Sequence, residues 1–186
     1  MELKQIPKIH YEGPGSKNPM AFKYYDAGRL VNGKSMREHL KFAMSYWHTL
    51  CADGTEMFGR GTMEKSFGTA ESAMDLYKNK AHAAFEIMDK LDIDYFCFHD
   101  RDIAPEGATI GECNENLDEI VSLLKDLMRQ YDKKLLWGTA NCFNNPRYAH
   151  GAATSCEADV FAYAAAQVKK AIDITIELGG TGYVFW

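Results

Sequence analysis

His99 and Asp102 are the side chains in this sequence whose types and spacing suit proton transfer. They follow the apolar run Tyr95-Phe-Cys-Phe, and Pro105 and Gly107 close the charged cluster that contains them. An apolar run that ends in titratable groups is typical of the catalytic end of a buried strand in an α/β protein. A carboxylate bonded to one imidazole nitrogen fixes the tautomer and raises the basicity of the other nitrogen, which can then move a proton on a substrate hydroxyl.

The spacing of this pair leaves two interpretations open. A separation of three residues is wrong for one face of a strand, so the carboxylate reaches the imidazole only if the chain turns after His99. The alternative is a structural histidine that is hydrogen-bonded in a loop. Asp100 and Arg101, which lie between the two, are interpreted as a solvated or structural pair.

Aromatic residues of other apolar runs are candidates for the same site. Short strands are expected at 41–49, 95–99, 135–141 and 183–186, and alternate residues of a strand share a face. One consistent choice of faces brings five side chains around a common centre near the strand ends: Trp47, His99, Trp137, Thr139 and Trp186. Indole faces pack against C–H surfaces while polar groups bind hydroxyls, so this set suits a neutral, polyhydroxylated ligand. The alternative is that the three tryptophans are ordinary core residues.

A metal site made by this chain alone is not expected. The histidines are scattered, and no two acids lie at ligand spacing with a histidine on a convincing face. If 41–49 is a strand, His48 faces away from Trp47, which favours a place in the core or an interface. His10 and His82 are interpreted as surface residues.

The composition sets the limits within which these residues act. A chain of 186 residues with 46% hydrophobic and 25% charged residues predicts one ordinary globular domain. The net charge of −5 argues against nucleic acid as a partner, and no apolar run is long enough to span a membrane. Five cysteines without a CxxC motif indicate neither a disulfide framework nor a zinc site, and they favour a reducing cytoplasm.

The chain reads as an irregular arm over 1–34 followed by β/α units over 35–186. A capping box at Ser35 and Glu38 predicts a short helix, and 52–68 is expected to be a long loop. Amphipathic periodicity predicts helices at about 69–90, 114–132 and 157–178, the last with a capping box at Thr154 and Glu157 and an end at Gly179-Gly180. Strands that alternate with such helices predict a parallel sheet joined by crossovers.

Several motifs, in order along the chain, resemble the longer (class II) xylose isomerases from about residue 6 to the end. They are Tyr46-Trp-His-Thr49, Phe98-His-Asp-x-Asp102 with Pro105-Glu-Gly107, Trp137-Gly-Thr-Ala-Asn141, Asn145-Pro-Arg-Tyr148 with His150-Gly-Ala-Ala-Thr154, and Gly182-Tyr-Val-Phe-Trp186. The resemblance implies a TIM (β/α)₈ barrel in tetramers. It also implies interconversion of D-xylose and D-xylulose, and of D-glucose and D-fructose.

The resemblance assigns roles to individual residues. It implies that His99 opens the sugar ring and that Asp102 orients it. Five further residues would form the pocket wall, Trp47 and Trp186 beside the reacting carbons and Trp137, Thr139 and Phe143 around them, and Phe58 would reach the site of a neighbouring subunit. The hydride shift would be assisted by two divalent cations, Mg²⁺, Mn²⁺ or Co²⁺, acting as Lewis acids.

The sequence departs from the family in two places. The second half of the barrel, which holds the family's metal ligands, is not in this sequence, and Lys65-Ser-Phe-Gly stands where the family usually has a Pro-Trp pair. We therefore expect the N-terminal half of a barrel, with about four strands and three crossover helices. Its open edges predict association with a second copy or a complementary half. The alternatives are a non-catalytic half barrel that oligomerises and a sugar-binding module.

Overall fold

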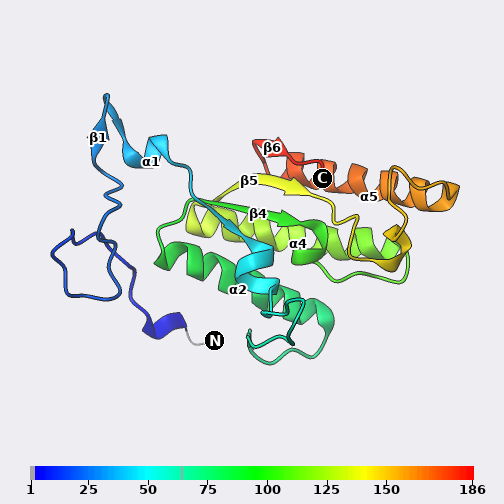
Figure 1. The fold of residues 1–186 in the computed structure, drawn as a ribbon, viewed down its shortest axis with the longest axis horizontal. Coiled ribbons are helices and arrows are strands. Elements are labelled where there is room, and N and C mark those ends of the chain that lie inside the picture. The colour runs from blue at the N-terminus through cyan, green and yellow to red at the C-terminus, as the bar shows by residue number, and fades with distance from the viewer. Residues whose placement is uncertain (1–2, 64) are drawn as a thin grey trace.

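The computed structural model describes residues 3–63 and 65–186, and a four-stranded parallel sheet forms its centre. The strands, in spatial order, are β3 (Ala43–Ser45), β4 (Tyr95–His99), β5 (Lys134–Thr139) and β6 (Gly182–Tyr183). Strands that follow one another along the chain are neighbours in the sheet, and each pair is parallel (Figure 1). The predicted α/β fold with four parallel strands is confirmed.

Three long helices connect the strands: α2 (Ala73–Lys90), α4 (Ile110–Tyr131) and α5 (Ala158–Glu177). Figure 1 shows them side by side along the sheet, with α4 between the other two. The three predicted helices are confirmed, but α2 begins after residue 69 and α4 begins before residue 114. The side chains of Ser72 and Thr109 accept hydrogen bonds from the backbone N–H groups of the first turns, and these caps define where the helices start.

The two ends of α5 show one wrong and one confirmed prediction. Thr154 and Glu157 do not form a capping box, because Glu157 is itself the N-cap residue and makes no side-chain hydrogen bond to the first turn. At the other end Gly179 has a φ of +68° and its N–H donates to the carbonyl of Ile176 at 2.9 Å. Glycine adopts this left-handed conformation without a steric cost, so the helix ends there as predicted.

Three predicted strands are shorter than expected, and one of them, 135–141, already ends at Thr139 in β5. The run 41–49 forms only β3, which pairs with the first three residues of β4, and then a π-helical turn, η2 (Trp47–Cys51). The run 183–186 pairs with β5 only through β6. Apolar runs indicate burial, and a helical turn or an unpaired extended segment at the end of a sheet can be buried as well as a strand.

A short helix that was not predicted, α3 (Asp100–Ile103), follows β4 directly. His99 is its N-cap residue, and its backbone N–H donates to a carboxylate oxygen of Asp102 at 2.8 Å. Helix α3 therefore supplies the turn that brings the carboxylate back to the imidazole.

The core lies between the sheet and the helices. Its largest fully buried side chains come from the residue after β3, from β4 and β5, from α3 and from all three long helices: Tyr46, Phe85, Met88, Phe96, Phe98, Ile103, Leu117, Ile120, Leu124, Leu127, Leu135 and Ile174. Burying large apolar side chains of this kind contributes about 1.5–3 kcal/mol each. The long helices are therefore held by the sheet that they cover.

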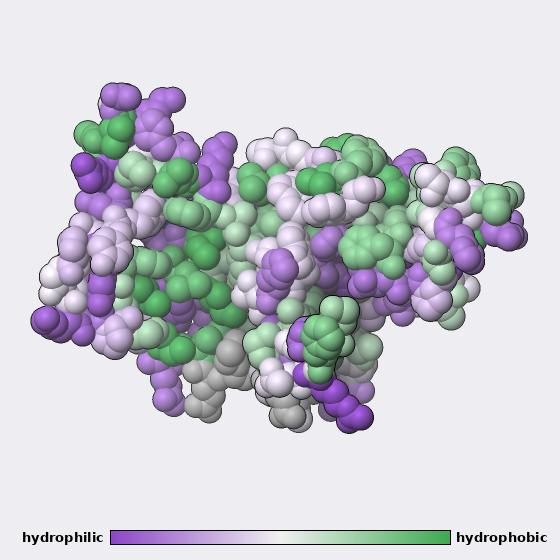
Figure 2. Space-filling view, viewed as in Figure 1, coloured by the Kyte–Doolittle hydropathy of each residue, from purple (hydrophilic) through white to green (hydrophobic). Residues whose placement is uncertain are grey.

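Residues 3–34 of the arm are irregular apart from a 3₁₀ turn, η1 (Leu3–Gln5), and the short strand β1 (Leu30–Val31). β1 pairs with β2 (Lys34–Ser35), which leads into α1 (Met36–His39), and the predicted capping box of Ser35 and Glu38 is present. Residues 8–11 make only one bridge, between Tyr11 and Phe22, and no strand. Figure 2 shows hydrophobic residues gathered where the arm meets the body of the molecule. A cavity of about 410 Å³ lies there.

Two further findings concern the cysteines and the length and apolar character of the helices. All five cysteines are free, with Cys97 and Cys113 buried. Among the described residues, no helix combines the length and apolar character needed to cross a bilayer.

Candidate active site

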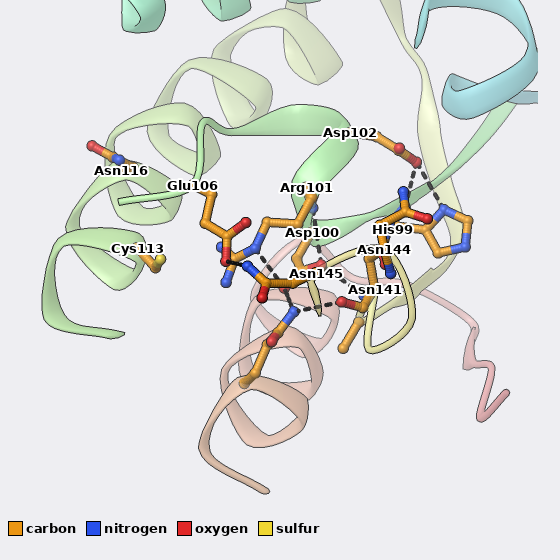
Figure 3. A network of polar contacts seen from close by, with 12 residues as sticks. His99, Asp100, Arg101, Asp102, Glu106, Cys113, Asn116, Asn141, Asn144 and Asn145 are labelled. Atoms are coloured by element: carbon orange, nitrogen blue, oxygen red, sulfur yellow. Dashed lines mark hydrogen bonds and ion pairs between the residues drawn. The ribbon is translucent and has the colours of Figure 1, made fainter. Parts of the chain in front are cut away.

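The imidazole of His99 and the carboxylate of Asp102 form a buried, hydrogen-bonded pair (Figure 3). Nδ1 of His99 lies 2.9 Å from Oδ2 of Asp102, and the two residues are 6% and 7% exposed. The same oxygen accepts the backbone N–H of His99 at 2.8 Å, so the carboxylate is held from two sides. Because a carboxylate accepts hydrogen bonds, Nδ1 carries the proton and Nε2 is the nitrogen available to a ligand. The predicted contact between these residues is confirmed, and the catalytic role stays a prediction.

Aromatic rings surround His99 on several sides. The centroid of its ring lies 4.8 Å from Trp47, 5.4 Å from Phe143 and 6.1 Å from Trp186, which stacks on it with an interplanar angle of 26°. Trp137 contacts Trp47 at 5.5 Å. Trp47, Phe143 and Trp186 thus lie around the imidazole although they come from segments far apart in the sequence. Trp137 joins this group only through Trp47, and the binding roles of these side chains stay predictions.

The rings of Trp47, Phe143 and Trp186 line an open cavity of about 560 Å³, which we call the aromatic cavity, whereas Trp137 does not line it. Its wall consists of aromatic, imidazole, amide and small side chains together with Asp102: Trp47, His48, Cys51, Ala52, His99, Asp102, Asn141, Phe143, Asn144 and Trp186. A cavity of this size holds a small ligand, and indole faces beside a few polar groups suit a polyhydroxylated one.

His48 is not where the sequence placed it. It is exposed and lines the aromatic cavity, with its ring 5.4 Å from that of Trp47, so the predicted place in the core is wrong and the place in an interface stays a prediction. The reason is the turn η2, since successive side chains of a helical turn are about 100° apart, whereas those of a strand point to opposite faces. The same turn sends Tyr46 into the core and Trp47 into the cavity.

Two other predicted site residues lie apart from the aromatic cavity. Thr139 is buried, and its hydroxyl donates to the carbonyl oxygen of Val184 at 2.5 Å, which ties β5 to the segment after β6. Its side chain lines a neighbouring cavity of about 540 Å³ that Phe143 and Trp186 also border. Phe58 is 86% exposed in the loop before α2, and its predicted contact with a neighbouring subunit stays a prediction.

Asp100 organises a buried network that sequence reasoning missed. Its carboxylate is fully buried and accepts the backbone N–H of Asn141 at 2.8 Å, the N–H of Arg101 at 2.9 Å and the amide of Gln167 at 2.8 Å (Figure 3). Gln167 also binds the carbonyl of Asn141 and accepts the hydroxyl of Tyr148. Burial raises the pKa of Asp100, while these donors and Arg101 favour its charged form. The structural interpretation of Asp100 is confirmed and the solvated one is wrong.

This network positions the loop that carries Phe143. The amide oxygen of Asn141 accepts the backbone N–H groups of Phe143 and Asn144, at 3.3 and 3.0 Å. Asp100 therefore links the end of β4 to the loop after β5, and so to the ring that contacts His99. One signal for the burial of Asp100 was present in the sequence. Because Asp100 directly follows His99 at the end of an apolar strand, its side chain must point away from the imidazole and into the protein.

The donors of a divalent-cation site are not assembled here. Among residues 3–63 and 65–186, no group of three or more histidine, cysteine, aspartate or glutamate side chains is placed to hold a metal ion. Mg²⁺ and Mn²⁺ require several oxygen ligands, so the described side chains do not fit the cations that the resemblance implies. We assign no step through a metal to this chain.

Comparison with known proteins identifies the relatives of the chain. No protein-family model matches it. The curated xylose isomerases of Thermoanaerobacter pseudethanolicus and Caldicellulosiruptor bescii are each 57% identical to it over 184 residues. The xylose isomerase of Bacillus cereus is 55% identical over the same length.

The match covers the chain far more fully than it covers its relatives. It includes 99% of this chain and 42% of the two 57%-identical proteins, so the chain spans about two fifths of their length. Identity at this level over nearly every residue establishes common descent. The chain is a homologue of the xylose isomerases, matching them over part of their length.

Proposed function

We propose that this chain binds an aldose in the aromatic cavity and opens its ring, as part of an isomerase that interconverts D-xylose and D-xylulose, and also D-glucose and D-fructose. The observation that carries the proposal is the His99–Asp102 pair, held in one tautomer beside three indoles. Homology to xylose isomerases supports the same reaction class.

The chemistry proposed for these residues is proton transfer. The indoles pack against the C–H face of the sugar, and Asn141 and Asn144 offer amide groups to its hydroxyls. Nε2 of His99 accepts the proton of the anomeric hydroxyl as the ring C–O bond breaks and the carbonyl forms, and the imidazolium, stabilised by Asp102, returns that proton to the ring oxygen. General acid–base catalysis of this kind contributes about 10²–10⁴-fold to a rate. The hydride shift and its Mg²⁺, Mn²⁺ or Co²⁺ ions are proposed for the complete isomerase only.

The proposed setting is the N-terminal half of a (β/α)₈ barrel in a cytoplasmic homo-oligomer, or one paired with a complementary half. The parallel sheet supports it, because β3 and β6 are edge strands with unpaired backbone groups. Exposed aromatic side chains at the β6 edge, Phe161, Phe185 and Trp186, give such an edge an apolar surface to bury. Sedimentation velocity over a range of concentrations tests this, and a monomer at every concentration would contradict it.

Polarimetry of freshly dissolved α-D-xylose tests the ring-opening step without requiring a metal. We expect the chain to accelerate mutarotation, and His99→Ala to remove about 99% of that acceleration. The matched control is His150→Ala, since His150 is exposed and lies outside the cavity. A wild-type rate equal to that of buffer, or a His99→Ala variant as fast as the wild type, would sink the proposal. Formation of xylulose with added Mg²⁺ or Mn²⁺ would extend it to the full isomerisation.

A second candidate function is sugar binding without turnover. The observation that favours it is that the described residues form an aromatic cavity but no metal-ligand set. Calorimetry distinguishes the two: xylose binding that is retained in His99→Ala, with no acceleration of mutarotation by the wild type, indicates a binding module. The absence of both indicates a non-catalytic half barrel.

A further inference from the structure

A cavity of about 410 Å³ adjoins the aromatic cavity, and we call it the cationic cavity. It is separate from the cavity of the same size beside the arm. The cationic and aromatic cavities share wall residues, Cys51, Ala52, Asp102, Asn141 and Asn144. Three positively charged side chains, Lys65, Lys80 and Arg101, line the cationic cavity and come from separate segments of the chain.

Lys80 is the least expected of these cations, because it is only 8% exposed. Its Nζ lies 3.5 Å from Sγ of Cys51, 3.4 Å from the carbonyl oxygen of Asp102 and 4.0 Å from the ring centre of Tyr77. Among the described residues, no carboxylate lies within ion-pair distance of it. A buried ammonium group is normally paired with an anion, so this environment leaves a positive charge to be compensated.

Arg101 adds charge to the same wall. Its Nε lies 3.9 Å from the buried carboxylate of Asp100, but Nη1 and Nη2 are buried without a hydrogen-bond partner in the part of the chain that the structure describes. Lys65 donates to two carbonyl oxygens, those of His48 and Ala52, which carry no net charge.

Two carboxylates, those of Asp102 and Asp53, also line this wall. Asp102 is bonded to His99, and the carboxylate of Asp53 accepts the backbone N–H of Thr55 at 2.8 Å. The cavity wall therefore carries three cationic side chains, two ammonium groups and a guanidinium, against two carboxylates, which leaves one positive charge in excess.

We propose that the cationic cavity binds a small tetrahedral oxyanion, with Lys80 and Lys65 as its direct partners and Arg101 contributing charge from the wall. Hydrogen bonds between ammonium groups and phosphate oxygens are among the strong ones in proteins. The oxyanion is either free in solution or the phosphoryl group of a ligand whose sugar part occupies the aromatic cavity. Because the two cavities share wall residues, a single phosphorylated sugar can occupy both of them.

Isothermal titration of the whole chain with inorganic phosphate, at low ionic strength, tests the site. We expect saturable binding that Lys80→Met weakens about tenfold or more and that Lys80→Arg retains, because the arginine keeps the charge. Lys65→Met provides a second variant from a different segment and is expected to weaken binding in the same direction. The matched control is Lys170→Met, because Lys170 pairs with Asp118 on the surface and lies outside the cavity. Circular dichroism confirms that each variant is folded.

Titration with xylose 5-phosphate distinguishes the two sources of the oxyanion. Affinity about tenfold above that of phosphate, with competition from xylose, assigns a phosphorylated sugar that bridges both cavities. Affinity equal to that of phosphate, without competition from xylose, assigns a free oxyanion. Phosphate that fails to bind, or that binds folded Lys80→Met and Lys65→Met as tightly as the wild type, overturns the proposal. Phosphate contains no sugar, so this failure would leave the ring-opening proposal intact if mutarotation is still accelerated.

Discussion

The centre and the edges of the sheet hold their parts of the candidate site in different ways. At the centre, where β4 and β5 end, His99, Asp102 and Asn141 are buried and hydrogen-bonded. At the edges, Trp47 follows β3 and Trp186 follows β6, and both are placed by ring contacts with His99. Trp186 remains 75% exposed. The pair of His99 and Asp102 is thus fixed by short, directional hydrogen bonds, whereas the aromatic wall depends on the packing of rings.

The largest expected effect comes from breaking the network at the centre. Asp100→Asn replaces a carboxylate that accepts three N–H groups with an amide that presents its own N–H₂ to them. We expect the free energy of unfolding to fall by about 3 kcal/mol, measured by urea denaturation.

The control for this change is Asp173→Asn, which removes a surface carboxylate paired with Lys169. It is expected to change stability by about 0.5 kcal/mol or less. Equal losses in the free energy of unfolding from Asp100→Asn and Asp173→Asn would show that the buried network stabilises the protein no more than a surface ion pair does.

A pair of glycines tests the same contrast in packing. A Cβ at Gly138 in β5 would lie 2.3 Å from Oγ1 of Thr175, whereas nothing lies within 4 Å of a Cβ at Gly182 in β6. Gly138→Ala should therefore destabilise the protein by about 2 kcal/mol through overpacking, and Gly182→Ala should be neutral within about 0.5 kcal/mol. Thermal melts of both variants measure the difference, and a reversed order would contradict the contrast.

Alkaline pH probes the central strand through its buried thiol. Burial raises the pKa of Cys97 to about 11 from its ordinary value of 9.0, so the folded state holds this proton more tightly than the unfolded chain. Its contribution to stability is complete below pH 9 and is lost as the pH rises toward 11. Between pH 8 and pH 10 we expect the free energy of unfolding of Cys97→Ala to fall by about 1 kcal/mol less than that of the wild type. Denaturant melts at the two pH values measure this, and identical losses would refute it.

The smallest expected effect on folding is at the β6 edge. Trp186→Ala removes an indole that is largely exposed, so the free energy of unfolding should change by about 0.5 kcal/mol or less. The same variant should weaken xylose binding about tenfold, because the stacked wall beside His99 is lost. A large loss of stability without a change in xylose affinity would show that Trp186 is a core residue and no part of a binding site.

The predictions that succeeded rest on periodic patterns. The helices α2, α4 and α5 and the strand 95–99 follow from the spacing of apolar residues, and the contact of His99 with Asp102 follows from the end of that strand. This periodicity is a local property of the sequence, and it arises because each element buries one face against a common sheet. These elements can therefore be predicted without coordinates.

The failures come from residues at the ends of strands. Nothing in the run 41–49 shows that extended pairing stops at Ser45, or that the turn η2 brings His48 to the cavity. The hydroxyl of Thr139 binds a backbone carbonyl that is distant in the sequence, a partner that no pattern showed, while its place in a ligand pocket stays a prediction. Such partners depend on where separate segments meet, which a local pattern does not contain.

The sequence by itself determined the alternation of strands and helices, the homology to xylose isomerases, and the position of an imidazole and a carboxylate just after a buried strand. Only the tertiary structure decided which residues complete the site. It buried Asp100 under Gln167 and Asn141, and it placed Lys80 beside Cys51 without an acidic partner among the described residues. The physical reason is that hydrogen bonds and charges act over a few ångströms in space, whatever the separation of their residues along the chain.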